Sequence, residues 1–235
     1  MKLLVGCPIW HREWIVDEWV DSVVLSAKYA DIKPQFLVVC DPRDPTSDKL
    51  TEICKKRRLG LKQIFVEENR PPTDKRQWTH ERFAHMVYLR NTLLKGVRRL
   101  GPEYFLSLDS DILLAPETIH NLIESSADYD AVGGKCYMTT RGKQVPSYAM
   151  FKPGSTSLRR SECSAVMRVH VIMAIKLMKP EAYKIDYTVD RHGEDIGWSL
   201  AARVGGLKLG WDGRVANKHV MHPQMLGVID DRVGF

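Results

Sequence analysis

Two aspartates one residue apart, Asp109 and Asp111, directly follow an apolar run of strand length that extends from Tyr104 to Leu108. Hard divalent cations such as Mg²⁺ and Mn²⁺ prefer carboxylate oxygens as ligands. In an open α/β sheet, ligands bind at the carboxyl ends of the strands, which is where this pair would lie. We therefore expect a divalent cation that holds a diphosphate. The alternative is a pair of aspartates that caps the strand end and the next turn.

A second pair with the same spacing, Asp128 and Asp130, lacks this setting. It follows Ser125, Ser126 and Ala127, a pattern typical of a helix end, and no apolar strand precedes it. Short motifs of this kind also arise by chance. The second pair is therefore predicted to lie in a solvated turn.

The charge balance favours anionic partners. The chain has 35 lysines and arginines against 29 aspartates and glutamates, a formal net charge of +6. Such a balance attracts nucleotide diphosphates, nucleic acids and anionic membrane surfaces. A basic tract from Arg141 to Arg160 permits a nucleic acid in particular.

No apolar stretch approaches the length of a membrane span. The first apolar run, Leu3 to Cys7, is too short for a signal peptide and is broken by Pro8. We therefore expect a cytoplasmic protein without a transmembrane segment. The cysteines show no C-x-x-C spacing, so buried reduced thiols are the expected state. They are Cys7, Cys40, Cys54, Cys136 and Cys163.

The first half of the chain alternates between apolar runs of strand length and amphipathic helices. Strands are predicted over 3–7, 36–40, 62–67 and 104–108, and helices over 14–30, 47–58, 79–100 and 116–126. This alternation predicts a mainly parallel sheet with helices on both faces. The first three strands end in polar or turn-forming residues, so several strand ends could build one site.

The second half is less regular. We predict a strand over 131–137, a basic loop-like tract over 139–162, a helix over 193–204, and strands over 207–211 and 215–220. Residues 164–178 mix strand and helix signals, and only the end of this segment is predicted to be helical. No linker or repeat divides the chain, which indicates one domain.

These motifs occur in an order that is typical of one family. In chain order they are Pro8 after the first strand, Asp41 after the second, Leu89-Arg90-Asn91, Leu108-Asp109-Ser110-Asp111, Gly193-Glu194-Asp195, Ala202 with Gly205-Gly206, and His219. From about Lys2 to His222 the chain resembles a GT-A-fold glycosyltransferase and is most similar to the family 2 type. The resemblance implies a Rossmann-like α/β fold in a single domain, 1–235. Its nucleotide-sugar half would cover about 1–115, and its acceptor and catalytic half about 116–235.

The resemblance also implies which residues hold the nucleotide sugar. The first βα turn and Asp41 would contact the base and ribose, and Arg90 would lie near the nucleotide. The alternatives are a turn residue before Pro42 for Asp41 and a solvated helix arginine for Arg90. The donor-contacting positions are Pro8, Trp10, Asp41, Arg90, Asp109 and Ser110.

The metal ligands implied by the resemblance are Asp109, Asp111 and His219, with Asp111 in direct contact with the cation. His222 competes with His219 because it lies three residues further along the chain. A strand would place the two rings on opposite faces, so we expect only one of them to bind, and we favour His219. A hydrogen-bonded surface histidine is the alternative.

Glu194 and Asp195 match the acidic pair that the family places at a helix N-terminus. In inverting members the second carboxylate is the base, so Asp195 would take the acceptor proton and Glu194 would orient it or the acceptor. Such a base must lie within about 3 Å of the hydroxyl that it deprotonates. The alternative is that the pair only complements the positive end of the helix dipole.

The sequence therefore predicts a metal-dependent, inverting glycosyltransferase with a nucleotide-sugar donor, UDP-linked, and Mn²⁺ or Mg²⁺ as cofactor. The acceptor hydroxyl stays open between modified DNA, a glycan and a protein, because Pro8-Ile9-Trp10-His11 departs from the Pro-x-Tyr-Asn usual in family 2. A nucleotidyltransferase is the second interpretation, although no Gly-rich phosphate loop follows the first strand. A non-catalytic module that binds a nucleotide sugar or a nucleic acid is the third.

Overall fold

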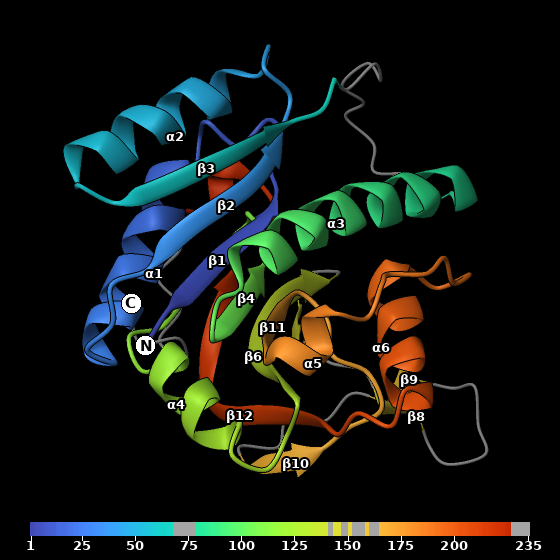
Figure 1. The fold of residues 1–235 in the computed structure, drawn as a ribbon. Coiled ribbons are helices and arrows are strands. Elements are labelled where there is room, and N and C mark those ends of the chain that lie inside the picture. The colour runs from blue at the N-terminus through green and yellow to red at the C-terminus, as the bar shows by residue number, and fades with distance from the viewer. Residues whose placement is uncertain (68–78, 141–142, 147–149, 152–157, 160–164, 227–235) are drawn as a thin grey trace.

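A mixed β-sheet with helices on both of its faces forms the frame of the protein (Figure 1). The computed structural model describes residues 1–67, 79–140, 143–146, 150–151, 158–159 and 165–226. The strands are β1 (Leu3–Pro8), β2 (Gln35–Cys40), β3 (Gly60–Phe65), β4 (Tyr104–Leu108), β5 (Ile112–Leu113), β6 (Ala131–Thr140), β7 (Lys143–Pro146), β8 (Met150–Phe151), β9 (Leu158–Arg159), β10 (Val166–Arg168), β11 (Ile175–Met178) and β12 (Leu209–His219). The helices are α1 (Val16–Tyr29), α2 (Pro45–Lys56), α3 (His80–Leu100), α4 (Thr118–Ser125), α5 (Pro180–Tyr183) and α6 (Glu194–Val204), followed by the short 3-10 helix η1 (Pro223–Met225).

Parallel pairing unites the strands of the first half, in the order β4-β1-β2-β3. Each parallel connection requires a crossover, which the helices between these strands supply. Strand β11 pairs antiparallel with both β4 and β6, and β6 pairs parallel with β12. The predicted α/β fold class is confirmed, and the carboxyl ends of β1, β2 and β4 lie at one edge of the sheet.

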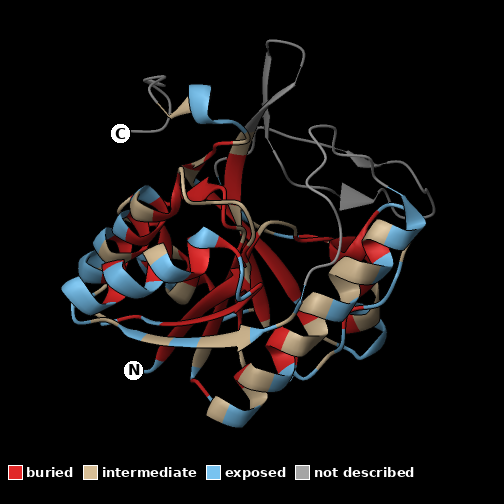
Figure 2. Ribbon diagram, turned by 90° about the horizontal axis from the view of Figure 1, so that it is seen from above, coloured by how far each residue is buried: buried red, intermediate tan, exposed pale blue. Residues whose placement is uncertain are grey.

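Two apolar cores form on the two faces of the sheet. Helices α1, α2 and α4 cover one face, where Trp19, Leu50 and Ile119 are buried together with side chains of β1 and β2. Helices α3, α5 and α6 cover the other, with Leu94 and Trp198 in its core. Figure 2 shows the result: the central strands are buried between helices that expose their outer sides, whereas the edge strand β3 is only partly covered. Successive side chains of β1 and β2 thus point alternately into one core and the other.

Local capping sets the ends of the helices. Helix α2 begins two residues earlier than predicted because the Asp44 carboxylate accepts the Thr46 N–H and Pro45 occupies the first turn. Helix α3 starts after Thr79, whose side chain accepts the Arg82 N–H, and ends at Gly101. Gly101 has φ 54°, a left-handed conformation that glycine adopts without strain.

The predictions for the second half need three corrections. The end of segment 164–178 is not helical, because Ile175–Met178 forms the buried strand β11 and the helix starts only at Pro180. The tract 139–162 is not all loop, since β6 continues to Thr140 and β7 pairs with it. The two strands predicted over 207–220 are one strand, β12, with an irregularity between Asp212 and Ala216.

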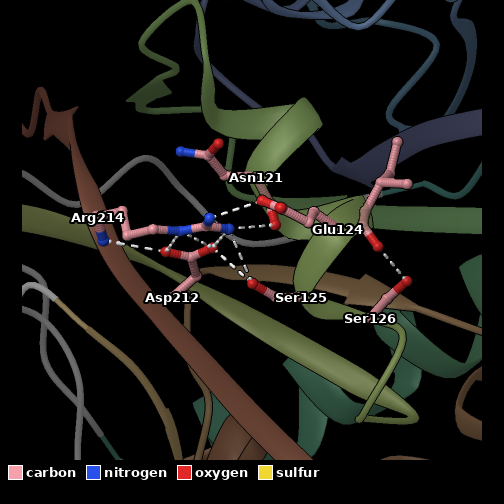
Figure 3. Close-up of polar contacts among 7 residues, drawn as sticks. Asn121, Glu124, Ser125, Ser126, Asp212 and Arg214 are labelled. Carbon is pink, nitrogen blue, oxygen red and sulfur yellow. Dashed lines mark hydrogen bonds and ion pairs between the residues drawn. The ribbon is translucent and has the colours of Figure 1, made fainter.

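An ion-pair network fixes that irregular part of β12 to helix α4 (Figure 3). Asp212 is 3% exposed and accepts hydrogen bonds from Arg214 Nη2 at 2.8 Å and Ser125 Oγ at 2.7 Å. Arg214 Nη1 lies 2.6 Å from Glu124, and its Nη2 donates to the Asn121 carbonyl at 3.0 Å. Burial opposes the ionised carboxylate, but these hydrogen bonds outweigh it and lower the pKa of Asp212.

Several smaller predictions can be compared with the structure. Cys7, Cys40, Cys54 and Cys136 are buried, as expected, whereas Cys163 and much of the basic tract 141–160 lie outside the described residues. Asp128 is exposed in a turn after α4. No helix in the described part of the chain combines the length and the apolar character that crossing a membrane requires. The division into a donor half and an acceptor half stays a prediction.

Candidate functional site

Asp109 and Asp111 lie in the turn after β4. Three hydrogen bonds to the backbone of Asp109 hold this turn in place. The Asp109 N–H donates to the Ala174 carbonyl at 3.0 Å, and its carbonyl accepts the Trp19 indole N–H at 3.1 Å. The Ile112 N–H donates to the same carbonyl at 3.1 Å. This fixed turn presents both aspartates at the sheet edge where β1 and β2 also end.

His219 reaches this turn because β12 pairs antiparallel with β5, with His219 opposite Ile112. The Val220 N–H donates to the Asp111 carbonyl at 2.8 Å, and His219 Nε2 lies 3.3 Å from Asp111 Oδ1. His222 is exposed at the start of η1. The structure therefore brings His219, not His222, to the aspartate pair. The alternative of a surface histidine is wrong, because His219 is buried.

Arg12 is a member of this site that the sequence analysis missed. Its Nη2 lies 3.1 Å from Asp111 Oδ2, and its guanidinium stands 5.8 Å from the centre of the Trp14 ring. The Asp111 carboxylate thus lies between a cation and an imidazole. The sequence offered one signal for Arg12, a basic residue soon after the first strand. A single arginine in a chain with many basic residues is too common to predict a site.

Arg90 joins the metal side of the site to the acidic pair. It is 3% exposed, so the alternative of a solvated helix arginine is wrong. One of its nitrogens donates to Ser107 Oγ at 3.1 Å, and the other is ion-paired with Asp109. The second nitrogen also lies 3.9 Å from Glu194 Oε1. Arg90 therefore links strand β4 to the first turn of α6.

The acidic pair lies in the first turn of α6. Two glycines, Gly193 and Gly197, allow this helix to start and pack where it does. Gly193 precedes the helix with φ 128°, a conformation open to glycine almost alone. A side chain at Gly197 would place its Cβ 2.0 Å from the Thr188 carbonyl oxygen, so the helix packs directly on that backbone. Glu194 and Asp195 are each 8% exposed, so both carboxylates are largely removed from water.

The two carboxylates of the pair have different surroundings. Asp195 is ion-paired with the fully buried Lys176 of β11. The pKa of Glu194 is raised to about 7, first by burial and then by the nearby Asp195 charge, and Arg90 opposes both effects. A carboxyl group that titrates near neutrality is typical of acid–base sites.

Lys176 and Tyr187 are further residues that the sequence analysis missed. The Tyr187 ring stands 5.1 Å from Lys176 Nζ and 5.8 Å from the Arg90 guanidinium carbon. Asn91 holds the Tyr187 backbone, accepting its N–H at 2.7 Å and donating to its carbonyl at 3.0 Å. The signal for Lys176 was present in the sequence, because it interrupts an otherwise apolar run from Val171 to Met178.

The residues expected to hold the base and ribose lie at the same edge, on the neighbouring strands. Asp41 is buried, and both its oxygens are bound by Arg43, at 2.7 Å to Nη2 and 2.8 Å to the backbone N–H. Trp10 lies against the His11 ring, with 4.3 Å between the ring centres. Pro8 ends β1, and Ser110 is buried in the turn after β4. Their contacts with a nucleotide stay predictions.

The aspartates and His219 fit a divalent cation chemically. They offer carboxylate oxygens and an imidazole nitrogen, a set that Mn²⁺ accepts. The 3.3 Å between His219 Nε2 and Asp111 Oδ1 is close to the separation of about 3 Å expected for neighbouring ligands of one such ion. His219 Nδ1 is buried without a hydrogen-bond partner among the described residues.

Another group of possible ligands, His11, Glu13 and Asp44, has ligand atoms within 4.8 Å of one another. The Asp44 oxygens already accept the N–H groups of His11 at 2.6 Å and Thr46 at 2.9 Å. The Asp44 carboxylate in this group therefore already caps the N-terminus of α2.

Comparison with curated proteins finds glycosyltransferases. Procollagen galactosyltransferase 1 of Danio rerio is 24% identical over 168 residues, covering 61% of this chain and 27% of that protein. Procollagen galactosyltransferase 1-B of Xenopus laevis is 30% identical over 137 residues, covering 52% and 21%. The chain therefore spans about a quarter of the length of the curated relatives it matches. No family model matches the chain.

Comparison with solved structures finds chains that share the fold. The TarS structure from S. aureus in complex with UDP-GlcNAc aligns with a TM-score of 0.62 at 20% identity, covering 94% of this chain and 59% of that one. The mannosyltransferase PcManGT from Pyrobaculum calidifontis, in complex with GDP-Man and Mn²⁺, aligns at 0.59 with 16% identity, covering 94% and 57%. A 4-diphosphocytidyl-2C-methyl-D-erythritol synthase aligns at 0.51 with 10% identity, covering 92% and 87%. The chain has the GT-A fold of glycosyltransferases.

Proposed function

We propose that the protein is a metal-dependent glycosyltransferase that moves a sugar from a nucleotide-sugar donor to a hydroxyl acceptor with inversion. The observation that carries the proposal is the position of Arg90. This buried cation is ion-paired with Asp109 and lies 3.9 Å from Glu194. It therefore joins the expected diphosphate site to the acidic pair that contains the expected base, the two parts that sugar transfer must hold side by side.

In this proposal the donor diphosphate lies at the turn after β4. Asp109, Asp111 and His219 would hold a divalent cation there. When bound, the cation would neutralise charge that develops on the leaving diphosphate. Arg12 and Arg90 would add positive charge on either side of the aspartates.

The acceptor hydroxyl attacks the anomeric carbon on the side opposite to the diphosphate. A new carbon–oxygen bond forms as the bond to the diphosphate breaks, and the nucleoside diphosphate leaves. Asp195 takes the hydroxyl proton as general base, and Glu194 orients Asp195 or the acceptor. The position of both carboxylates in the first turn of α6, next to Arg90, supports these roles.

The donor is proposed to be a UDP-sugar. TarS was solved with UDP-GlcNAc and the GalNAc-T7 structure with UDP, GalNAc and Mn²⁺, although PcManGT holds GDP-Man. The names of the curated relatives, procollagen galactosyltransferases, support a hexose donor and are compatible with a protein acceptor. A glycan and modified DNA remain the other proposed acceptors.

The test is release of free nucleoside diphosphate from a panel of UDP- and GDP-linked hexoses, with Mn²⁺ or with EDTA. We expect release from one donor, abolished by EDTA and by Asp111→Asn. The matched control is Asp128→Asn, which changes the exposed first aspartate of the second pair with the same spacing and should not alter release. Release that persists in Asp111→Asn would contradict the assigned site.

Two companion measurements separate the rival functions. The fold is shared with a 4-diphosphocytidyl-2C-methyl-D-erythritol synthase, so the fold alone does not establish sugar transfer. A nucleotidyltransferase would release pyrophosphate from a nucleoside triphosphate and a sugar phosphate. A binding module would take up Mn²⁺ and nucleotide, measurable by calorimetry, without release of product.

A further inference from the structure

Lys176 occupies the middle of the sheet, where a charge is costly. It lies on β11 opposite Ser107 of β4 and Gly133 of β6, and it is 0% exposed. A lysine removed from water normally loses its proton unless a partner compensates. Its position therefore requires an anion beside it.

Asp195 is that anion. Within the described part of the chain it is the carboxylate that forms an ion pair with Lys176 Nζ. The ammonium also stands 5.1 Å from the centre of the Tyr187 ring and 5.7 Å from that of Trp198, distances at which aromatic faces attract a cation. Lys176 is thus held on several sides while it contacts one carboxylate oxygen, Oδ1.

A buried ion pair of this kind is poor evidence for stability. The cost of removing both charges from water often exceeds their attraction, and apolar replacements of similar volume can leave a protein equally stable. The core around Tyr187 and Trp198 could have accommodated an apolar residue at position 176. Stability alone therefore does not account for this pair.

We infer that Lys176 is a positioning residue that keeps Asp195 ionised and holds its Oδ1, so that Oδ2 is directed at the acceptor hydroxyl. This inference rests on the proposed function, in which Asp195 is the base. It adds a residue from a different strand to the catalytic arrangement. The ion pair sets both the charge and the direction of the base.

The other charged and titratable groups around the pair agree with this role. Arg90 comes from α3, Tyr187 from the segment between α5 and α6, and Glu194 from α6 itself. Burial lowers the pKa of Lys176, but the attraction of Asp195, together with that of Tyr187, outweighs it and the pKa is raised. Lysine stays a cation throughout the range in which a carboxylate base works. Arg90 is ion-paired with Asp109 and lies 3.9 Å from Glu194, whereas Lys176 is ion-paired with Asp195.

The first test is the pH dependence of the reaction in Lys176→Met. Without the ammonium, burial favours the neutral acid of Asp195. The acid limb of kcat/KM should move upward by at least one pH unit, kcat at pH 7 should fall at least tenfold, and the donor KM should stay within twofold. Lys135→Met, which removes a second buried lysine of the sheet, is the matched control and should leave the limb in place. An unmoved acid limb in folded Lys176→Met would overturn the inference.

The second test does not depend on activity. Urea unfolding of Lys176→Met, Asp195→Asn and the double variant forms a cycle. We expect Lys176→Met to lower the urea midpoint and the added Asp195→Asn to raise it again, because the amide leaves no unpaired buried charge. If Lys176→Met does not fold, recovery of folding in the double variant supports the ion pair. Additive losses, or no recovery, would contradict it.

The proposed function and the proposed role of Lys176 can fail separately. No nucleoside diphosphate from any donor with wild-type protein would refute the proposed function, and the unfolding cycle would still report on the pair. Turnover by wild type with an unchanged pH profile in Lys176→Met would refute the role of Lys176 alone.

Discussion

Replacing Glu194 by glutamine should make the protein more stable at pH 8 while leaving its stability near pH 4 almost unchanged. The reason is the burial of this carboxyl group, which raises its pKa from 4.5 to about 7. Glutamine keeps the size and most of the hydrogen-bonding capacity of the side chain. It removes the charge that the folded protein must hold next to Asp195.

The sign follows from proton binding. Between pH 4.5 and 7 the folded state keeps a proton on Glu194 that the unfolded state has lost, so the free energy of unfolding falls as pH rises through this window. One pKa unit corresponds to about 1.4 kcal/mol, and the shift of about 2.5 units gives at most about 3 kcal/mol at pH 8. Below pH 4.5 both states are protonated, and the penalty disappears.

The assay is urea unfolding of wild type and Glu194→Gln at a series of pH values from 4 to 8, followed by tryptophan fluorescence. EDTA in all samples keeps divalent cations away from the neighbouring aspartates. The advantage of the variant should grow from near zero at pH 4 to about 2–3 kcal/mol at pH 8. The control is Glu52→Gln on the exposed side of α2, for which no such growth is expected. Parallel stability curves for wild type and Glu194→Gln would refute the reasoning.

Three further changes test other parts of the structure. Asp111→Asn should weaken Mn²⁺ binding at least tenfold in calorimetry, because it removes a charged ligand; unchanged affinity would exclude Asp111 as a ligand. Asp212→Asn should lower the free energy of unfolding by about 2 kcal/mol at pH 7, because it leaves Arg214 without its buried partner. Since the pKa of Asp212 is lowered on folding, this loss should shrink as pH falls and the wild-type carboxylate is protonated; a loss independent of pH would contradict it. Gly197→Ala should destabilise by about 1–3 kcal/mol and reduce nucleoside diphosphate release, since its Cβ would stand 2.0 Å from the Thr188 carbonyl oxygen, and a fully active variant would show that α6 can shift.

The frame of the protein was predictable because its signals are local. Apolar runs and helical periodicity identify β1 to β4 and α1 to α4, since each element shows its own pattern of burial within a few residues. The first half differs from the predictions mainly at element ends, and the errors in element type fall in the second half of the chain. Strand β11 carries a lysine inside an apolar run and lies between two other strands, so its pattern does not distinguish strand from helix.

Parts of the candidate site could also be expected from sequence. Asp109 and Asp111 stand at a strand end, and Gly193 precedes an acidic helix start, which are both short-range patterns. The structure brings these segments to one edge of the sheet and adds Arg12 to them. Arg12 and Asp111 are 99 residues apart in the chain, so no short-range pattern connects them.

The sequence by itself determined the α/β class, the position of the aspartate pair and the acidic helix start, because these depend on neighbouring residues. Only the tertiary structure decided which groups face one another. The pairing of β5 with β12 brings His219 to Asp111, and the antiparallel insertion of β11 sets Lys176 against Asp195. Such contacts depend on strand order and register, which the amino-acid pattern of a single strand does not encode.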